Sequence, residues 1–276
     1  MKIIKTVAVS ACLAVLIACH REVPKSTGVE WDTLNKEVME LLHSGQYDRA
    51  LVVGKKALEV AESQGGPNHP DVATSLNNLA VLYNSLGQFA MAEPLYKRSL
   101  TIKEKAFGRN HPSVATCLNN LAELYRSQGN YAQAEPLYKR SLAILEKTVG
   151  STHPSVATSL NNLALLYVAQ GKFAKAEPLF KRSLVIWEQV FGPNDPSLTL
   201  SIESLASTYR AQAKYALAEP LFRRALTIQE STLGPNHPDL AASLENLAAV
   251  YREDRKPKEA AQLEQRAAAI RALKRR

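Results

Sequence analysis

The stretch NLAELYRSQGNYAQAEPLYKRSLAI, residues 120–144, occurs three times along the chain in closely related forms. It is preceded 42 residues earlier by NLAVLYNSLGQFAMAEPLYKRSLTI (78–102) and followed 42 residues later by NLALLYVAQGKFAKAEPLFKRSLVI (162–186). A catalytic motif needs to occur once, whereas a structural unit that stacks on copies of itself recurs at a fixed period. The sequence therefore predicts a linear array in which neighbouring units share one continuous core.

Each 42-residue unit begins with a short marker that predicts a helix start. The marker ends in His-Pro or Asp-Pro and stands at 68–70, 110–112, 152–154, 194–196 and 236–238. Proline suits the first helical position because it has no N–H to leave unpaired and its φ is already fixed. From Leu76 to Leu86 apolar residues recur at steps of three and four, and Gly87 is expected to end the helix in a left-handed cap. A second helix is expected over about 89–107, so each unit is predicted to form a helical hairpin.

This pattern resembles the tetratricopeptide repeat, in the 42-residue form found in kinesin light chains and many bacterial proteins. The matching positions are Ala80, Tyr83, Gly87, Phe89, Ala92 and Tyr96, and again Ala122, Tyr125, Gly129, Tyr131, Ala134 and Tyr138. The resemblance covers about residues 34–273 and implies an all-α fold, a right-handed superhelical α-solenoid with a concave groove that binds peptides. The array is predicted over residues 31–276, with about six hairpins at about 31–67, 68–109, 110–151, 152–193, 194–235 and 236–276.

The two ends of the array depart from the repeat pattern, and one proline strains it. The first hairpin lacks the Asn-Asn pair of the inner units, while Arg255 and Pro257 replace the glycine and the aromatic residue of the last turn, so both ends are predicted to be caps. A proline also falls inside each inner second helix, where it removes a backbone hydrogen bond to residue i−4. Either these helices begin later than position 89 and its equivalents, or their first turn is loose. The prolines are Pro94, Pro136, Pro178 and Pro220.

The candidate binding surface is the face of each first helix that points away from the second helix. In the second unit this face carries Thr74, Asn78, Val81 and Ser85. An asparagine amide offers both donors and an acceptor, so a ladder of them is suited to a peptide backbone. The family resemblance supports this role for the column of Asn78, and the alternative is that the asparagines bridge adjacent first helices. The column of Asn78 continues as Asn120, Asn162, Ser204 and Asn246, with Asn77, Asn119 and Asn161 beside it.

Charged residues replace part of the ladder in the C-terminal half. Glu203 and Glu245 stand where the other units have asparagine, and three arginines fall at the margin of the predicted groove. Arginine can grip a carboxylate with two parallel hydrogen bonds, which favours an acidic stretch in the partner, or the arginines can pair with glutamates of the chain itself. The three arginines are Arg126, Arg210 and Arg252.

A basic dipeptide recurs in the second helices, four residues after a glutamate. This order and spacing favour an ion pair along one helix, which predicts a solvated outer face. Attraction to anionic lipid or cell-wall polymer is the alternative interpretation. Nucleic acid is not an expected partner, because no aromatic stacking platform accompanies the charges. The glutamates and dipeptides are Glu93 with Lys97-Arg98, Glu135 with Lys139-Arg140, Glu177 with Lys181-Arg182 and Glu219 with Arg223-Arg224.

The first nineteen residues, MKIIKTVAVSACLAVLIAC, have the layout of a secretory signal. Lys2 and Lys5 precede an uncharged apolar run that is short for a bilayer-spanning helix. The ending Leu-Ile-Ala-Cys resembles the lipobox of bacterial lipoproteins, which implies that Cys19 is lipidated. Residues 1–18 are therefore expected to be a signal peptide and 19–30 a lipidated tether. His20 follows the cysteine where an aspartate would favour the inner membrane, so resemblance to lipoprotein sorting implies the outer membrane.

No constellation of catalytic or metal-binding residues emerges from the sequence. The recurring marker histidines lie on separate hairpins, about 10 Å apart by helix-packing distances, which is too far for one metal ion. Cys117 occupies a slot that is serine in other units and is expected to be a small helix residue. The sequence predicts a non-enzymatic scaffold or adaptor without cofactor or metal, anchored by lipid and binding a protein or peptide. A pilus or outer-membrane assembly factor, or a binder of envelope polymer, is the alternative.

Overall fold

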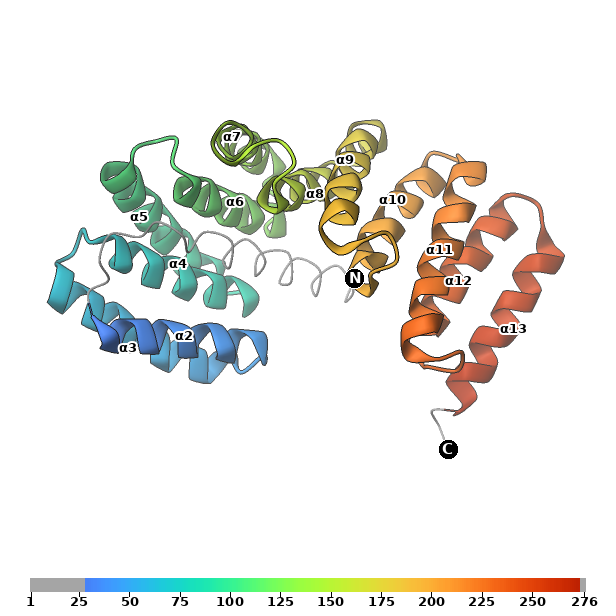
Figure 1. Ribbon diagram of the computed structural model, residues 1–276, viewed down its shortest axis with the longest axis horizontal. Helices are drawn as coiled ribbons and strands as arrows, with labels where there is room; N and C mark the ends of the chain where they lie inside the picture. Colours follow the sequence, from blue (N-terminus) through green and yellow to red (C-terminus); the bar gives the residue numbers. More distant parts are fainter. Residues whose placement is uncertain (1–27, 274–276) are drawn as a thin grey trace. The chain divides into compact units, whose positions relative to one another are not determined.

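The computed structural model describes residues 28–273, and this part of the chain contains twelve α-helices and one short 3-10 helix (Figure 1). The predicted signal peptide and Cys19 lie outside the described residues, and the first helix begins at Val29, two residues before the predicted end of the tether. The helices are α2 (Val29–His43), α3 (Tyr47–Gly65), α4 (Pro70–Ser85), α5 (Phe89–Phe107), α6 (Pro112–Ser127), α7 (Tyr131–Val149), α8 (Pro154–Ala169), α9 (Phe173–Phe191), η1 (Pro196–Leu198), α10 (Thr199–Ala211), α11 (Tyr215–Leu233), α12 (Leu240–Glu253) and α13 (Pro257–Leu273).

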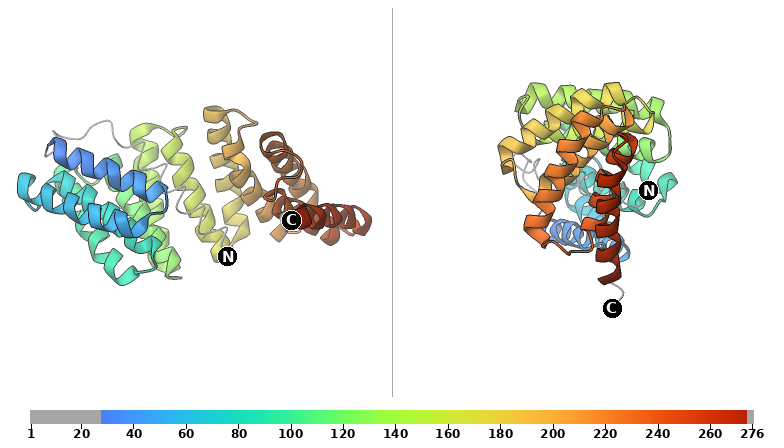
Figure 2. Two further views of the ribbon diagram at one scale, coloured as in Figure 1. Left: turned by 90° about the horizontal axis from the view of Figure 1, so that it is seen from below. Right: turned by 90° about the vertical axis from the view of Figure 1, so that its right-hand side faces the viewer.

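The chain divides into two compact units within α8, the first ending at Asn162 and the second beginning at Leu163. In the first unit each helix of the pairs α2 and α3, α4 and α5, and α6 and α7 lies beside its partner (Figures 1 and 2). In the second unit α10 and α11, and α12 and α13, pair in the same way. The predicted all-α fold of stacked helix pairs is confirmed. No helix among residues 28–273 is long and apolar enough to cross a bilayer.

The marker residues act as N-caps of the first helices, as predicted. The Nδ1 atom of His69 accepts a hydrogen bond from the backbone N–H of Asp71 at 3.2 Å, and His111 and His153 make the same bond two residues ahead at 3.2 Å. In the fifth hairpin the Asp195 carboxylate replaces the imidazole and accepts a hydrogen bond from the Ser197 N–H at 2.9 Å. Each cap satisfies one of the N–H groups that a helix start leaves unpaired.

The tight turn inside each hairpin needs one residue in the left-handed backbone conformation, and this residue is usually glycine. Gly87 has φ 73°, and the N–H of Gln88 donates back to the Tyr83 carbonyl at 2.8 Å, which closes the end of α4. In the last two hairpins Ala213 and Arg255 adopt φ 55° and 60° at the equivalent position. A side chain at positive φ strains the backbone, so these two turns are less stable than the glycine turns.

The internal prolines do not delay the start of the second helices. Helix α5 begins at Phe89 and contains Pro94, and the Gln88 carbonyl accepts from the N–H groups of both Met91 (3.1 Å) and Ala92 (3.2 Å). The first turn is therefore partly 3-10 in character, which corresponds to the loose first turn of the two alternatives. Pro94 deprives the Ala90 carbonyl of its helical bond, but Ala90 is exposed, so water can take the place of the missing donor.

The core lies between the two helices of each hairpin and between successive hairpins within a unit. Leu76 of α4 is fully buried, and Ala92 and Tyr96 of α5 are 0% and 1% exposed. The first hairpin joins this core through Trp31, whose indole N–H donates to the Ser75 hydroxyl of α4 at 2.9 Å. Each first helix is thereby fixed against its neighbours, and this positions the side chains of its remaining face.

Candidate binding face

The asparagine ladder connects neighbouring first helices by side-chain hydrogen bonds. The Nδ2 atom of the donor asparagine reaches the Oδ1 atom of an asparagine 43 residues earlier, on the preceding first helix. The ladder therefore bridges adjacent first helices, which was the alternative to a purely peptide-binding role. The three pairs are Asn78 to Asn35 at 2.8 Å, Asn120 to Asn77 at 3.0 Å and Asn162 to Asn119 at 3.3 Å.

One expectation about this ladder is wrong. Side chains on a groove face are expected to be exposed to solvent, but Asn78 is 3% exposed and Asn120 is fully buried, because an amide bonded between two helices must lie at their junction. The first hairpin lacks the Asn-Asn pair, yet Asn35 occupies the position equivalent to Asn77 and accepts the first bond. The binding role of the asparagines stays a prediction. Asn77, Asn119, Asn161 and Asn162 are likewise buried.

The ladder leaves hydrogen-bonding atoms of opposite kind unsatisfied. Among the described residues, Asn78 Oδ1 and Asn119 Nδ2 are buried and have no hydrogen-bond partner. One is an acceptor and the other a donor, and a peptide group offers the complement of both. Buried polar atoms without partners are rare in folded proteins, and a role in binding is one explanation for them.

The second unit carries a different set of side chains at the ladder positions. Glu203 and Ser204 lie on α10, and Glu245 and Asn246 lie on α12. The Ser243 hydroxyl donates to Glu203 Oε1 at 2.6 Å, which links α10 to α12 in place of an amide pair. Burial raises the pKa of Glu203 above its usual value, and the bond from Ser243 offsets only part of that effect.

The three predicted groove arginines are all paired with glutamates of the chain. Arg126 donates from Nε and Nη2 to the two carboxylate oxygens of Glu123, at 2.7 Å and 2.5 Å, and the Tyr138 hydroxyl donates to the same carboxylate at 2.7 Å. Burial acts to lower the pKa of Arg126, but the bonds and charge of Glu123 outweigh it and raise the pKa. Intramolecular pairing is thus the alternative that holds. Arg210 pairs with Glu253 at 3.7 Å, and Arg252 with Glu264.

The predicted ion pairs along the second helices are present in all four inner hairpins, in α5, α7, α9 and α11. Glu93 and Lys97 are 2.7 Å apart, and Glu219 and Arg223 are 3.1 Å apart. The pairs Glu135 with Lys139 and Glu177 with Lys181 are each 2.7 Å apart. The spacing rule for helical ion pairs therefore identifies these partners correctly.

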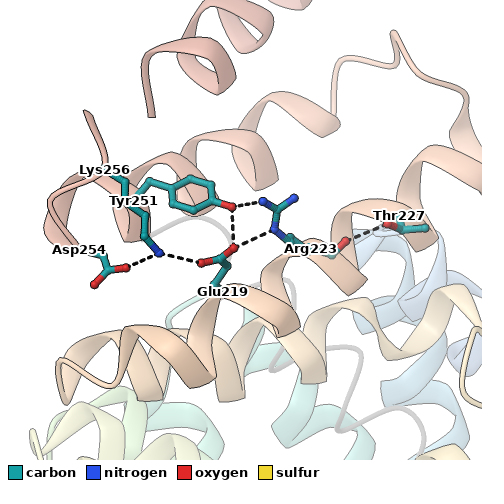
Figure 3. A network of polar contacts seen from close by, with 6 residues as sticks. All are labelled: Glu219, Arg223, Thr227, Tyr251, Asp254 and Lys256. Atoms are coloured by element: carbon teal, nitrogen blue, oxygen red, sulfur yellow. Dashed lines mark hydrogen bonds and ion pairs between the residues drawn. The ribbon is translucent and has the colours of Figure 1, made fainter. Parts of the chain in front are cut away.

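The sequence interpretation missed a tyrosine that joins these ion pairs to the next hairpin. The Tyr125 hydroxyl of α6 donates to Glu93 Oε1 of α5 at 2.9 Å. Figure 3 shows the equivalent cluster in the second unit, where Tyr251 donates to Glu219 at 2.8 Å and Lys256 approaches the same carboxylate at 3.4 Å. The constant spacing of 32 residues between glutamate and tyrosine is the signal that identifies this contact.

The hydrogen bonds of these clusters shift the pKa values of the groups that make them. Hydrogen bonds from Lys181 and then Lys214 lower the pKa of Glu177 to about 2. The bond to Glu177 raises the pKa of Lys181 to about 12. The ammonium groups of Lys181 and Lys214 are therefore held by the Glu177 carboxylate at neutral pH.

The second residue of the basic dipeptide contacts the end of the preceding hairpin at Arg98, Arg140 and Arg224. Arg98 donates to Glu62 at 2.7 Å and to the Pro67 carbonyl at 3.2 Å, and Arg140 donates to Glu104 at 2.6 Å and to the Arg109 carbonyl at 3.0 Å. These arginines are thus structural links between hairpins, a role that the spacing rule within one helix does not reveal. Arg224 and Arg266 make the equivalent pairs of contacts in the second unit.

Two further observations concern the cysteine and the metal-binding residue types within residues 28–273. Cys117 is fully buried, and its sulfur lies 3.3 Å from the Ser99 hydroxyl. Within residues 28–273 no three His, Cys, Asp or Glu side chains gather closely enough to hold a metal ion.

Stacked helical hairpins joined by ladders of equivalent contacts define the class of α-helical repeat proteins. A tetratricopeptide repeat family model matches the chain at residues 39–105, 78–147, 113–189, 155–230 and 198–272. The chain therefore belongs to the tetratricopeptide repeat family, whose arrays are scaffolds suited to protein–protein interaction. A comparison with curated proteins found no match.

Several solved structures share the fold. A putative kinesin light chain with nearly identical repeats from Podospora anserina is 31% identical, with a TM-score of 0.69, over 75% of this chain and 99% of that one. BtubC (BKLC) from P. vanneervenii is 24% identical, with a TM-score of 0.71, over 83% and 92%. PilW, a type IV pilus biogenesis factor, is 18% identical, with a TM-score of 0.67, over 88% and 94%. The expected kinesin-light-chain-like form of the repeat is confirmed.

Proposed function

We propose that this protein is a lipid-anchored scaffold of the bacterial cell envelope that binds an extended segment of a protein partner along its first helices. The observation that carries the binding part of the proposal is the pair of unsatisfied amide atoms, Asn78 Oδ1 and Asn119 Nδ2. An extended backbone presents an N–H and a C=O on the same edge of each alternate residue. It can therefore form hydrogen bonds with both kinds of atom whatever its side chains are.

Recognition of this kind favours backbone shape over sequence. Each hydrogen bond to a peptide contributes about 0.5 to 1.5 kcal/mol, so several in a row are needed for micromolar affinity. Both amide atoms are buried in the free chain. The side chains that flank them must therefore move apart before a partner can form hydrogen bonds with these atoms. Thr74 is one such side chain, because it lies one turn before Asn78 and is only partly buried.

The anchoring part of the proposal rests on the sequence before Val29. Lipid on Cys19 with further acyl chains gives stable attachment, whereas a single chain binds membranes only marginally. About ten residues separate Cys19 from the first helix, and when extended they reach about 35 Å. The array is thereby held close to the membrane, with the outer membrane favoured by His20.

A photocrosslinking experiment tests the binding face. A photoreactive phenylalanine analogue replaces Thr74 on α4 or, as the matched control, Thr101 on the outer side of α5; both threonines bond to a backbone carbonyl four residues earlier. After illumination of cells, the proposal expects a partner adduct at position 74 and none at position 101. Adducts confined to position 101 would place the partner on the outer face and refute the proposed site.

A second experiment separates anchoring from binding. Cys19→Ser is expected to abolish palmitate labelling and to release the protein from membranes, while the adduct at position 74 still forms with the partner in extracts. Unchanged palmitate labelling of the Cys19→Ser chain would refute the anchor and leave the binding proposal standing.

Assembly of an envelope complex is the more specific candidate function. What supports it is the fold shared with PilW, a type IV pilus biogenesis factor, over 88% of this chain. The alternative of an envelope-polymer binder is disfavoured, because the outer basic residues are engaged by carboxylates such as Glu93 and Glu177. Loss of an assembled surface structure on deletion of the protein tests the assembly role.

A further inference from the structure

Glu203 differs from the other carboxylates near the first helices of its unit because it has no cationic partner. It lies on α10 at the ladder position of Asn77 and Asn119, and its only hydrogen bond is the one from the Ser243 hydroxyl at 2.6 Å. No ion pair to Glu203 is present among residues 28–273. Its neighbours Glu245 and Glu253 are paired with Arg271 and Arg210.

A carboxylate in this situation is destabilised by its surroundings. Glu203 is half-buried, so part of the water around its charge is removed, and one hydroxyl supplies less compensation than a cation does. The raised pKa of Glu203 has burial as its main cause and no nearby cation opposes it. A positive group arriving from outside would relieve this cost without displacing an existing partner.

The arginines of the same unit are not in this state. Arg210 and Arg252 are each paired with a glutamate of the chain, so an acidic partner would have to compete with those bonds. The unbalanced charge at the ladder positions is therefore negative, which is opposite to the acidic partner that the arginines alone predict.

We propose that Glu203 is a specificity-determining residue that receives the side chain of a lysine or arginine in a segment bound along the first helices of the second compact unit, α10 and α12. This inference rests on the proposed function, because Glu203 occupies a position equivalent to the asparagines of the ladder. The cation replaces the missing ion-pair partner, while Ser243 continues to orient the carboxylate. Charge complementarity of this kind selects among partners that the backbone contacts alone do not distinguish.

A library of random peptides displayed on phage provides the test, with the full chain purified in detergent. The variants are Glu203→Gln, which keeps the shape and removes the charge, and Glu245→Gln, whose charge Arg271 already neutralises. The peptide pool bound by the natural chain is expected to be enriched in lysine and arginine over the input. The Glu203→Gln pool should lose this enrichment, and the Glu245→Gln pool should keep it. Equal enrichment in the Glu203→Gln pool would overturn the inference.

A synthetic peptide from the bound pool sharpens the result. Replacing its lysine by norleucine is expected to weaken binding to the natural chain at least tenfold and to leave binding to Glu203→Gln unchanged. Equal affinity of the two peptides for the natural chain would overturn the inference alone, because peptides still bind. If no variant retains peptides above background, the proposed function fails, and the inference fails with it. Unchanged helical circular dichroism of Glu203→Gln excludes misfolding as the cause of a difference.

Discussion

The amide of Asn120 on α6 donates to the Asn77 carbonyl oxygen on α4 across 3.0 Å, and both side chains are almost completely buried. The same position in the repeat thus holds neighbouring hairpins together and lies on the face proposed to bind a partner. Changes to the ladder therefore alter stability as well as binding. A variant that removes three asparagines at once is a poor test of recognition for this reason.

Asn120→Ala is expected to reduce the free energy of unfolding by about 1 to 3 kcal/mol, because the buried Asn77 oxygen loses its donor. Urea denaturation followed by circular dichroism measures the change. The double variant Asn77→Ala/Asn120→Ala should lose less than the sum of the single variants, since the second change removes an atom that is already unpaired. The control is Asn246→Ala, a half-buried ladder position, for which a smaller loss is expected. An Asn120→Ala chain as stable as the natural one would contradict the bridging role.

Tyr251→Phe removes the hydroxyl that joins α12 to Glu219 on α11, which should cost about 1 kcal/mol of stability (Figure 3). The acceptor is charged but partly exposed, so the effect is smaller than for a buried pair. Thr227→Ala serves as the control, because its hydroxyl bonds to the Arg223 carbonyl within its own helix at 3.0 Å. Equal effects of the two substitutions in thermal unfolding would show that the inter-helix bond contributes nothing particular.

Ala213→Gly and Arg255→Gly should each stabilise the chain by about 0.5 to 1 kcal/mol. Relief of positive φ yields about 1 to 2 kcal/mol, and the greater flexibility of unfolded glycine removes part of that gain. The reverse substitution, Gly171→Ala, should destabilise by about 1 kcal/mol. Its φ is 70° and an added Cβ would meet open space, so the backbone conformation alone is tested. A stabilising Gly171→Ala would refute the strain account.

Glu203→Gln should raise stability at neutral pH and have little effect near pH 4. The folded pKa of Glu203 is raised, so the folded state binds more protons than the unfolded state between the unfolded and folded pKa values. The natural chain therefore loses stability as pH rises through this window, and the full penalty applies above it. The difference between the two chains in urea denaturation isolates this residue from all others. A difference that grows as pH falls would have the wrong sign for a raised pKa.

The periodicity of the sequence predicts the helices closely, because apolar spacing, histidine caps and left-handed glycines each act within one hairpin. Helix α5 begins and ends at the expected residues, Phe89 and Phe107. The contacts between hairpins were less predictable. The bonds of Asn120 to Asn77 and of Arg98 to Glu62 join residues 43 and 36 positions apart, so they depend on how two hairpins pack. The signal that identifies these contacts is a residue pair that recurs in successive repeats of this sequence at a constant spacing.

The most direct test of the central claim is the affinity of the crosslinked partner segment, made as a synthetic peptide, for two bulky variants of the full chain. Thr74→Trp fills the first-helix face beside Asn78, and Thr101→Trp places the same side chain on the outer side of α5, where Thr101 is exposed. Both variants should keep the melting temperature of the natural chain within a few degrees. Calorimetric titration is predicted to show at least tenfold weaker binding for Thr74→Trp and natural affinity for Thr101→Trp. Natural affinity for Thr74→Trp, with binding lost only in Thr101→Trp, would contradict the account.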